Sequence, residues 1–89
     1  MEFKVVEESK NRIEFELPGE THTFCNALKE ELKCLKGVEA ATYRIDHPLV
    51  GMPRFLIETK NLEPRKALQT ALKTLKHKAE ELKKGIKEL

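Results

Sequence analysis

Residues 64–89 read PRKALQTALKTLKHKAEELKKGIKEL, the most strongly patterned part of this chain. Pro64 suits the first turn of a helix, where its missing amide hydrogen costs nothing. Apolar residues then recur at alternating spacings of four and three, the heptad pattern of one continuous helix face. We name this face the seam, and it comprises Leu68, Leu72, Leu75, Ala79, Leu82, Ile86 and Leu89. The pattern predicts a long C-terminal helix with one apolar face.

The predicted helix is longer than the rest of the chain can cover. At ~1.5 Å per residue, residues 64–89 reach ~39 Å, whereas a domain of this length is ~30 Å across. We expect the first half of the seam to be covered, which leaves residues 79–89 in water. Each large apolar side chain left exposed forgoes roughly 1.5–3 kcal/mol of burial free energy. Since extended apolar strips on a surface mark interfaces, the far end of the seam predicts a partner.

Upstream of this helix, four segments are predicted to be strands, and the first three alternate polar and apolar residues with a period of two. This alternation is typical of strands with one buried and one solvated face, which belong mainly to antiparallel sheets. The segments are residues 2–5, 12–17, 38–47 and 54–60. Ser9, Lys10 and Asn11 supply turn residues between the first two, so we expect a hairpin there. His47 and Pro48 end the third segment, because proline lacks an amide donor and disfavours helical backbone before it.

A shorter helix is predicted over residues 21–36. Thr21 is a suitable N-cap, because its hydroxyl can accept from an amide two or three residues further on. Gly37 suits the left-handed position that follows many helices. The apolar residues of this helix fall on one stripe, at Phe24, Leu28, Leu32 and Leu35. The stripe predicts that one face of the helix lies on the sheet.

The predicted elements follow the order β-β-α-β-β-α. This order favours an α+β fold of two layers: a four-stranded, mainly antiparallel sheet with two helices on one face, the C-terminal helix being long. The chain has 89 residues, so residues 1–89 are expected to form a single domain. Hydrophobic residues make up 39% of the chain. That share is enough for a thin core and too little for an enclosed substrate cavity, which excludes a large multi-step enzyme.

Hydrophobic runs are short throughout the chain. None approaches the ~18–20 consecutive apolar residues of a membrane span. No charged-then-apolar leader opens the sequence. We therefore expect a soluble cytoplasmic protein that does not bind a membrane.

Positive charge is concentrated in the predicted C-terminal helix. The net charge is +2, but residues 1–63 carry 9 Lys or Arg against 12 Asp or Glu, and residues 64–89 carry 8 against 3. The lysines spread around the circumference outside the seam, and Arg65 is the only arginine among them. Helices that read nucleic acids combine arginine with aromatic or amide side chains. A solvated face is therefore favoured and no sequence-specific nucleic-acid binding is expected, with weak backbone contact to DNA or RNA as the alternative.

Candidate chemical groups are few. Cys25 and Cys34 would lie ~13 Å apart along a helix, too far for a disulfide. His22, Cys25 and His47 are the only combination that could form a metal or nucleophile site, and they lack recognised ligand spacings. Carboxylates are dispersed over polar faces without a matched acid and base. We therefore expect no catalytic residue, no metal and no cofactor, and a small His-dependent hydrolase is the least favoured alternative.

Three segments carry a more specific motif. They are Gly19–Leu28 with the sequence GETHTFCNAL, Tyr43–Leu49 with YRIDHPL, and Pro53–Thr59 with PRFLIET. Together they resemble the small alpha-like subunit family of multisubunit RNA polymerases, in particular the archaeal subunit L family. The resemblance spans about residues 13–75 in the same element order. Thr21 stands where this family usually has an acidic residue, and both residue types cap helices.

The resemblance implies a non-catalytic subunit of DNA-directed RNA polymerase, the nucleotidyltransferase of transcription. In that family the small subunit pairs with a larger alpha-like subunit, designated D, and the pair is the platform on which the large catalytic subunits assemble. Carried over to this chain, the contact between helices would use Phe24, Leu28 and Leu32, extended by Leu75, Leu82 and Ile86. His22, Thr23 and Asn26 would fix the start of the first helix, and His47 and Pro48 the strand exit.

A stand-alone module is the alternative interpretation of the same seam. Such a protein would homodimerise or act as an adaptor outside a polymerase, with the same fold and the same apolar face. A tight homodimer that does not bind the larger alpha-like subunit would favour this alternative. A polymerase subunit purified without its partner could also form a homo-oligomer through the uncovered seam.

Overall fold

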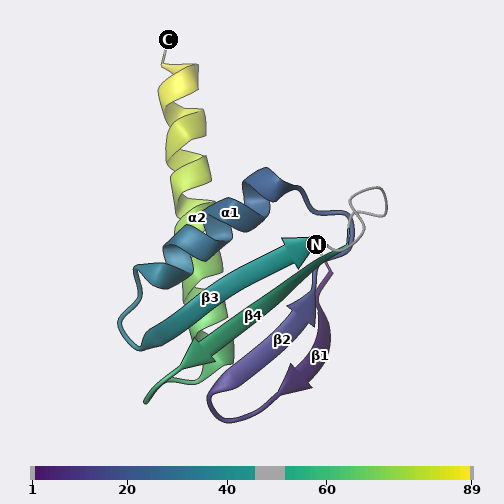
Figure 1. Ribbon diagram of the computed structural model, residues 1–89. Helices are drawn as coiled ribbons and strands as arrows, with labels where there is room; N and C mark the ends of the chain where they lie inside the picture. The colour runs from purple at the N-terminus through teal and green to yellow at the C-terminus, as the bar shows by residue number, and fades with distance from the viewer. Residues whose placement is uncertain (1, 46–51, 89) are drawn as a thin grey trace.

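The computed structural model describes residues 2–45 and 52–88, and within them it contains four strands and two helices in the predicted order (Figure 1). They are β1 (Lys4–Glu8), β2 (Arg12–Glu16), α1 (His22–Lys33), β3 (Val38–Ile45), β4 (Pro53–Thr59) and α2 (Pro64–Lys87). The predicted α+β class and the order β-β-α-β-β-α are confirmed.

The strands form one antiparallel sheet in the order β1-β2-β4-β3. Ile13 and Phe15 of β2 stand opposite Ile57 and Phe55 of β4, and Tyr43 of β3 stands opposite Phe55. Residues opposite one another in antiparallel strands share a face, so the apolar residues of these strands gather on one side. α1 lies over β3, and α2 lies over β2 and β4 (Figure 1). Both helices therefore cover the apolar face, as predicted.

Aromatic rings cross the sheet beneath the helices. Phe15 and Phe55 stack with ring centroids 5.4 Å apart, and Tyr43 stacks on Phe55 at 5.3 Å. Phe3 contacts Phe15 with centroids 5.7 Å apart. Aromatic pairs of this kind add about 0.5–1.5 kcal/mol beyond the burial of their surface. The row of rings connects the start of the chain through β2 and β4 to β3.

α1 ends earlier than the sequence predicts. The helix stops at Lys33 rather than Lys36, because the amide of Leu35 donates to the carbonyl of Leu32 and tightens the chain into a turn. Gly37 then adopts a φ of +100°, in the left-handed region that favours glycine. The left-handed glycine after the helix is confirmed, while the helix itself is shorter.

Replacing Gly37 by alanine is expected to destabilise the fold by about 1–3 kcal/mol, because alanine rarely adopts this backbone conformation. The added Cβ would also lie 3.2 Å from Leu62 Cβ and 3.3 Å from the carbonyl oxygen of Lys60. Gly85→Ala is the matched control, since that glycine lies in α2 with open space at its Cβ position. Alanine there should stabilise the protein by roughly 0.5–1 kcal/mol. Urea unfolding measures both variants, and shifts of the same sign would contradict the prediction.

Candidate partner interface

The N-terminal half of α2 is packed on the sheet. Pro64 occupies the first turn, as predicted. Ala67 and Ala71 are buried, and their short side chains let the helix approach the strands closely. Leu68, the first seam residue, is buried beside them. These contacts fix the direction in which the rest of α2 leaves the domain.

The C-terminal half of α2 projects beyond the sheet and α1 (Figure 1). Leu72 and Leu75 are half-buried against the core, whereas residues 76–88 are all exposed. Leu82 is 67% exposed and Ile86 is 60% exposed, the highest values among the large hydrophobic side chains of the described residues. Within residues 2–45 and 52–88, the prediction that the fold covers the first part of the seam and leaves its far end in water is confirmed.

An ion pair connects this projecting half of α2 to α1. The ammonium group of Lys78 donates a hydrogen bond to the Glu31 carboxylate, and this contact raises the pKa of Lys78. Lys78 is largely exposed, and ion pairs in such positions add little to stability. The pair therefore matters more for orientation, since it holds the start of the projecting segment against α1.

The centre of the apolar stripe of α1 faces inward in the single chain. The resemblance implies that Leu28 and Leu32 contact a partner, but both are 0% exposed in the core of this chain. α1 packs on β3 and against α2. The side chains at the centre of its stripe are therefore buried by contacts within the chain. Phe24 is only half-buried and remains, with the seam, in the predicted partner surface.

The start of α1 is held by a cap and by a contact to β3. The Thr21 hydroxyl accepts from the Phe24 amide at 3.2 Å, which confirms the predicted N-cap. His22 Nδ1 lies 3.2 Å from the Tyr43 hydroxyl oxygen, and that hydroxyl lies 3.5 Å from the His22 carbonyl oxygen, to which it donates. The resemblance gave His22 a role at the helix start without a partner for it. The alternation of β3 is the signal that places Tyr43 on the helix-facing side.

The remaining candidate residues are not brought together. Thr23 and Asn26 are exposed on α1, and His47 and Pro48 lie outside the described residues. Burial raises the pKa of the Cys25 thiol and the Glu20 carboxylate raises it further, the opposite of what activates a nucleophile. No group of metal-ligating side chains large enough to hold an ion occurs in residues 2–45 and 52–88. In the same part of the chain, no helix combines the length and the apolarity that crossing a membrane requires.

β1 and α2 form an apolar groove that the sequence patterns do not reveal. Its lining consists of Phe3 and Val5 on one side, Leu68, Gln69, Leu72 and Arg65 on the other, and Ile13 and Phe15 at the floor. We name it the β1–α2 groove. Val5 is 45% exposed, although it stands opposite Phe15 and so shares the helix-facing side of the sheet. The alternation of Phe3 and Val5 was the available signal, but it does not show whether a helix of the same chain covers them.

Arg65, which lines the β1–α2 groove, pairs with Glu8 of β1. Arg65 Nε donates to Glu8 Oε2 at 2.9 Å and its Nη2 donates to Oε1 at 2.7 Å, a bidentate pair. Hydrogen bonding from Arg65 lowers the pKa of the Glu8 carboxyl below its ordinary value of 4.5, and the same contact raises the pKa of Arg65. The pair ties the end of β1 to the first turn of α2.

In an Arg65→Gln variant, the pKa of Glu8 is expected to rise toward 4.5. Because the folded-state pKa is depressed, the contact stabilises the native state above the unfolded-state pKa and is lost as the pH falls through the folded value. Carboxyl carbon shifts during an acid titration measure Glu8 in both proteins. Lys66→Gln is the matched control, since it removes the same charge from the next position. An equal effect of both substitutions would contradict the specific pairing.

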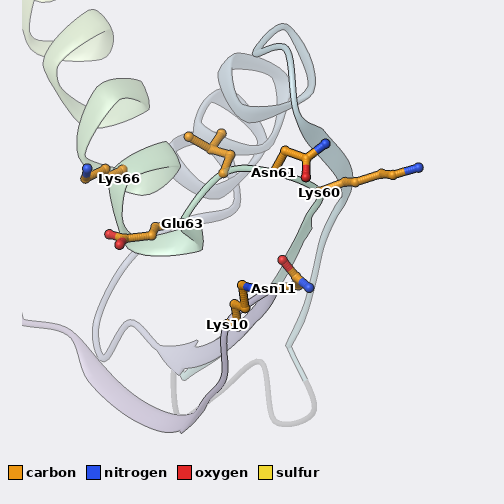
Figure 2. A pocket seen from close by; sticks show the side chains of 7 residues that line it. Lys10, Asn11, Lys60, Asn61, Glu63 and Lys66 are labelled. Carbon is orange, nitrogen blue, oxygen red and sulfur yellow. The ribbon is translucent and has the colours of Figure 1, made fainter.

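A second hollow, polar in character, lies between the β1–β2 turn and the start of α2 (Figure 2). It is lined by Lys10, Asn11, Lys60, Asn61, Leu62, Glu63 and Lys66. Figure 2 shows the side chains of Lys60 and Lys66 extending in opposite directions, and Glu63 adds an acidic group between the turn and α2. The charged groups do not converge on a common point, so the hollow supports no ligand chemistry.

Comparisons with known proteins agree with this architecture. The model of a family described as RNA polymerase Rpb3/Rpb11 dimerisation domain matches residues 12–85. The DNA-directed RNA polymerase subunit Rpo11 of Methanothermobacter thermautotrophicus is 38% identical over 86 residues, which cover 97% of this chain and 99% of that protein. The Rpo11 of Nanoarchaeum equitans is 47% identical over 76 residues, which cover 84% and 79%. The crystal structure of DNA-directed RNA polymerase subunit L from Thermoplasma acidophilum superposes with a TM-score of 0.86 at 26% identity, covering 98% of this chain and 86% of that one.

Proposed function

The chain belongs to the family of RNA polymerase Rpb3/Rpb11 dimerisation domains, and from this membership we propose that it is an assembly subunit of DNA-directed RNA polymerase. Relatives that it matches over most of their length are named as polymerase subunits Rpo11 and L. We infer that it pairs with the larger alpha-like subunit, and that the pair supports assembly of the large catalytic subunits. Its own contribution is binding, and nucleotidyl transfer belongs to other subunits.

The projecting half of α2 is the observation that carries this proposal. Leu82 and Ile86 are both more than half exposed on a helix that continues beyond the rest of the described chain. Covering both side chains would release roughly 2–4 kcal/mol of burial free energy. In a member of a family of dimerisation domains, an uncovered apolar face of this kind supports a contact with a second subunit.

The basic residues of α2 favour a solvated face over a nucleic-acid site. Its lysines lie on several sides of the exposed helix, at Lys76, Lys83, Lys84 and Lys87 among others. Arg65, the only arginine of α2, is engaged by Glu8 at the opposite end from the projecting segment. Since base recognition depends on arginine and amide side chains, this distribution supports a protein partner.

Co-expression with the larger alpha-like subunit from the same source tests the proposal. We expect a one-to-one complex that persists at ~1 μM during size-exclusion chromatography with light scattering. A tight homodimer that does not bind the larger subunit would overturn the proposal and support the stand-alone module. A chain that stays monomeric beside the larger subunit would overturn it as well.

A further inference from the structure

We propose that the face of the sheet opposite the helices binds an acidic segment of a large catalytic subunit through Arg44 and Arg54, an inference that rests on the proposed function. α1 and α2 both pack on the same side of the sheet (Figure 1). The other side, which we name the outer face, has no helix over it in the part of the chain that the structure describes. A partner that covers the seam and the helices therefore leaves the outer face accessible to a further subunit.

The strand register places the two arginines next to each other on the outer face. Arg54 of β4 stands directly opposite Arg44 of β3. Arg54 alternates with the buried Phe55, so its side chain lies on the outer side of the sheet. Residues directly opposite in antiparallel strands have Cβ atoms ~4.5–5.5 Å apart, and like charges in this position destabilise the pairing. A carboxylate bound between the two guanidinium groups would offset this repulsion.

A small hollow beside the arginine pair has room for one side chain. Its volume is about 120 Å³, roughly that of four water molecules. It is lined by Arg44, Arg54, Leu56, Glu14, Thr42 and Tyr43. Leu56 is half-buried on the outer face and stands opposite Glu14 on one side and Thr42 on the other. It offers an apolar contact to the methylene groups of an Asp or Glu side chain whose carboxylate reaches the arginines.

The ion pair between Arg54 and Glu16 is a loose one. Arg54 Nη2 lies 3.7 Å from Glu16 Oε1, which is too far for a hydrogen bond. The bidentate pair of Arg65 and Glu8, by contrast, has distances of 2.7 and 2.9 Å. A guanidinium carries five N–H donors in a fixed fork that matches the geometry of a carboxylate. Arg54 is therefore suited to bind a second carboxylate through two parallel hydrogen bonds.

Arginine is scarce in this chain, and most of it lies on the outer face. Four of the 17 basic residues are arginines. Arg12, Arg44 and Arg54 lie on the outer face, and Arg65 pairs with Glu8. Protein interfaces are enriched in arginine and depleted in lysine relative to the rest of the surface. This distribution favours a protein contact on the outer face over a surface that meets only water.

The charge balance of the outer face favours a protein over a nucleic acid. The register gives this face four basic and four acidic residues, which are Lys4, Arg12, Arg44, Arg54, Glu7, Glu14, Glu16 and Glu58. Their charges sum to zero, whereas binding to a phosphate backbone depends on an excess of positive charge. Positive charge is concentrated only where β3 and β4 carry the two adjacent arginines. A protein that places carboxylates at this point matches the pattern.

Arg44→Gln combined with Arg54→Gln tests this inference. Lys4→Gln combined with Arg12→Gln is the matched control, because it removes two positive charges from the same face at residues outside the lining of the hollow. The pair with the larger alpha-like subunit is titrated calorimetrically with each large catalytic subunit. We expect the arginine double variant to weaken the binding of one of them at least ~10-fold and the control to change it less than ~2-fold. Urea unfolding, and undiminished pairing with the alpha-like subunit, establish that both variants retain the fold.

A crosslink from position 44 gives a readout that does not depend on affinity. In an Arg44→Lys variant, a carbodiimide joins the lysine ammonium to a carboxylate in direct contact with it. We expect mass spectrometry of the assembled complex to find position 44 joined to an Asp or Glu of a large catalytic subunit.

The outcomes separate this inference from the proposed function. A wild-type chain that does not pair, or a pair that binds no large catalytic subunit, overturns the proposed function and this inference with it. When the wild-type pair does bind one, the inference alone is overturned by undiminished binding of the arginine double variant or by an equal loss in the control. Crosslinks from position 44 only to a second copy of this chain or to the alpha-like subunit overturn it too. An affinity of the pair for duplex DNA that disappears only in the arginine double variant would assign the outer face to nucleic acid instead.

Discussion

Replacing Leu82 and Ile86 together by alanine is expected to weaken binding of the larger alpha-like subunit ~30- to 1000-fold. Both side chains are more than half exposed in the free chain. The surface that alanine lacks is worth about 1–2 kcal/mol at each position when a partner buries it. Both residues lie beyond the packed part of α2, so the free energy of unfolding of the isolated chain should change by less than ~0.5 kcal/mol. Calorimetry measures the affinity, and urea unfolding measures the stability.

The matched control for this double variant is Glu80→Ala combined with Lys84→Ala. These residues have the same spacing of four on α2 and are exposed. At 3.6 residues per turn they lie on the side of the helix away from Leu82 and Ile86. One charge of each sign is removed, so the net charge is unchanged. Loss of affinity in the seam variant alone assigns the contact to the seam, while equal losses in both variants, or none in either, would count against it.

The projecting half of α2 could be predicted from the sequence because it depends on two local quantities. The spacing of four and three defines the apolar face along the whole helix, and the rise per residue gives its length. The exposure of Leu82 and Ile86 follows from that length, since the rest of the chain is too short to reach them. No knowledge of the tertiary contacts is needed for this step.

The stripe of α1 shows what helical spacing cannot decide. Spacing identifies the apolar side of a helix, but it does not show whether the cover belongs to the same chain. Phe24 and Leu28 share one stripe, yet Leu28 is 0% exposed and Phe24 is half-buried. The difference depends on where α2 crosses α1. This is a tertiary arrangement, in which Glu31 and Lys78 are in contact although they lie 47 positions apart in the sequence.

The β1–α2 groove depends on equally distant contacts. Arg65 in its lining contacts Glu8 of β1 across 57 positions of sequence. Its floor depends on the pairing of β2 with β1 and β4. The alternation of Phe3 and Val5 predicts an apolar side on the first strand. It does not predict that this strand lies at the sheet edge beyond the cover of α2.

Leu28→Ala is expected to lower the free energy of unfolding of the isolated chain by about 2–5 kcal/mol. Leu28 is 0% exposed between α1 and the sheet, so truncation removes buried surface and leaves a cavity. Domains have about 5–15 kcal/mol of total stability, and this loss is a large part of it for 89 residues. Urea unfolding measures it as a lower midpoint at an unchanged m-value.

Leu82→Ala makes the same substitution at an exposed position, and the two variants should separate folding from binding. We expect Leu82→Ala to change the free energy of unfolding by less than ~0.5 kcal/mol and to weaken the affinity for the larger alpha-like subunit. Leu28→Ala should do the reverse, provided that calorimetry is run at a temperature where it remains folded. If Leu28→Ala proved as stable as the wild type and yet failed to bind the larger subunit, Leu28 would belong to the partner contact that the resemblance implies. The packing of α1 on its own sheet would then be the incorrect assignment.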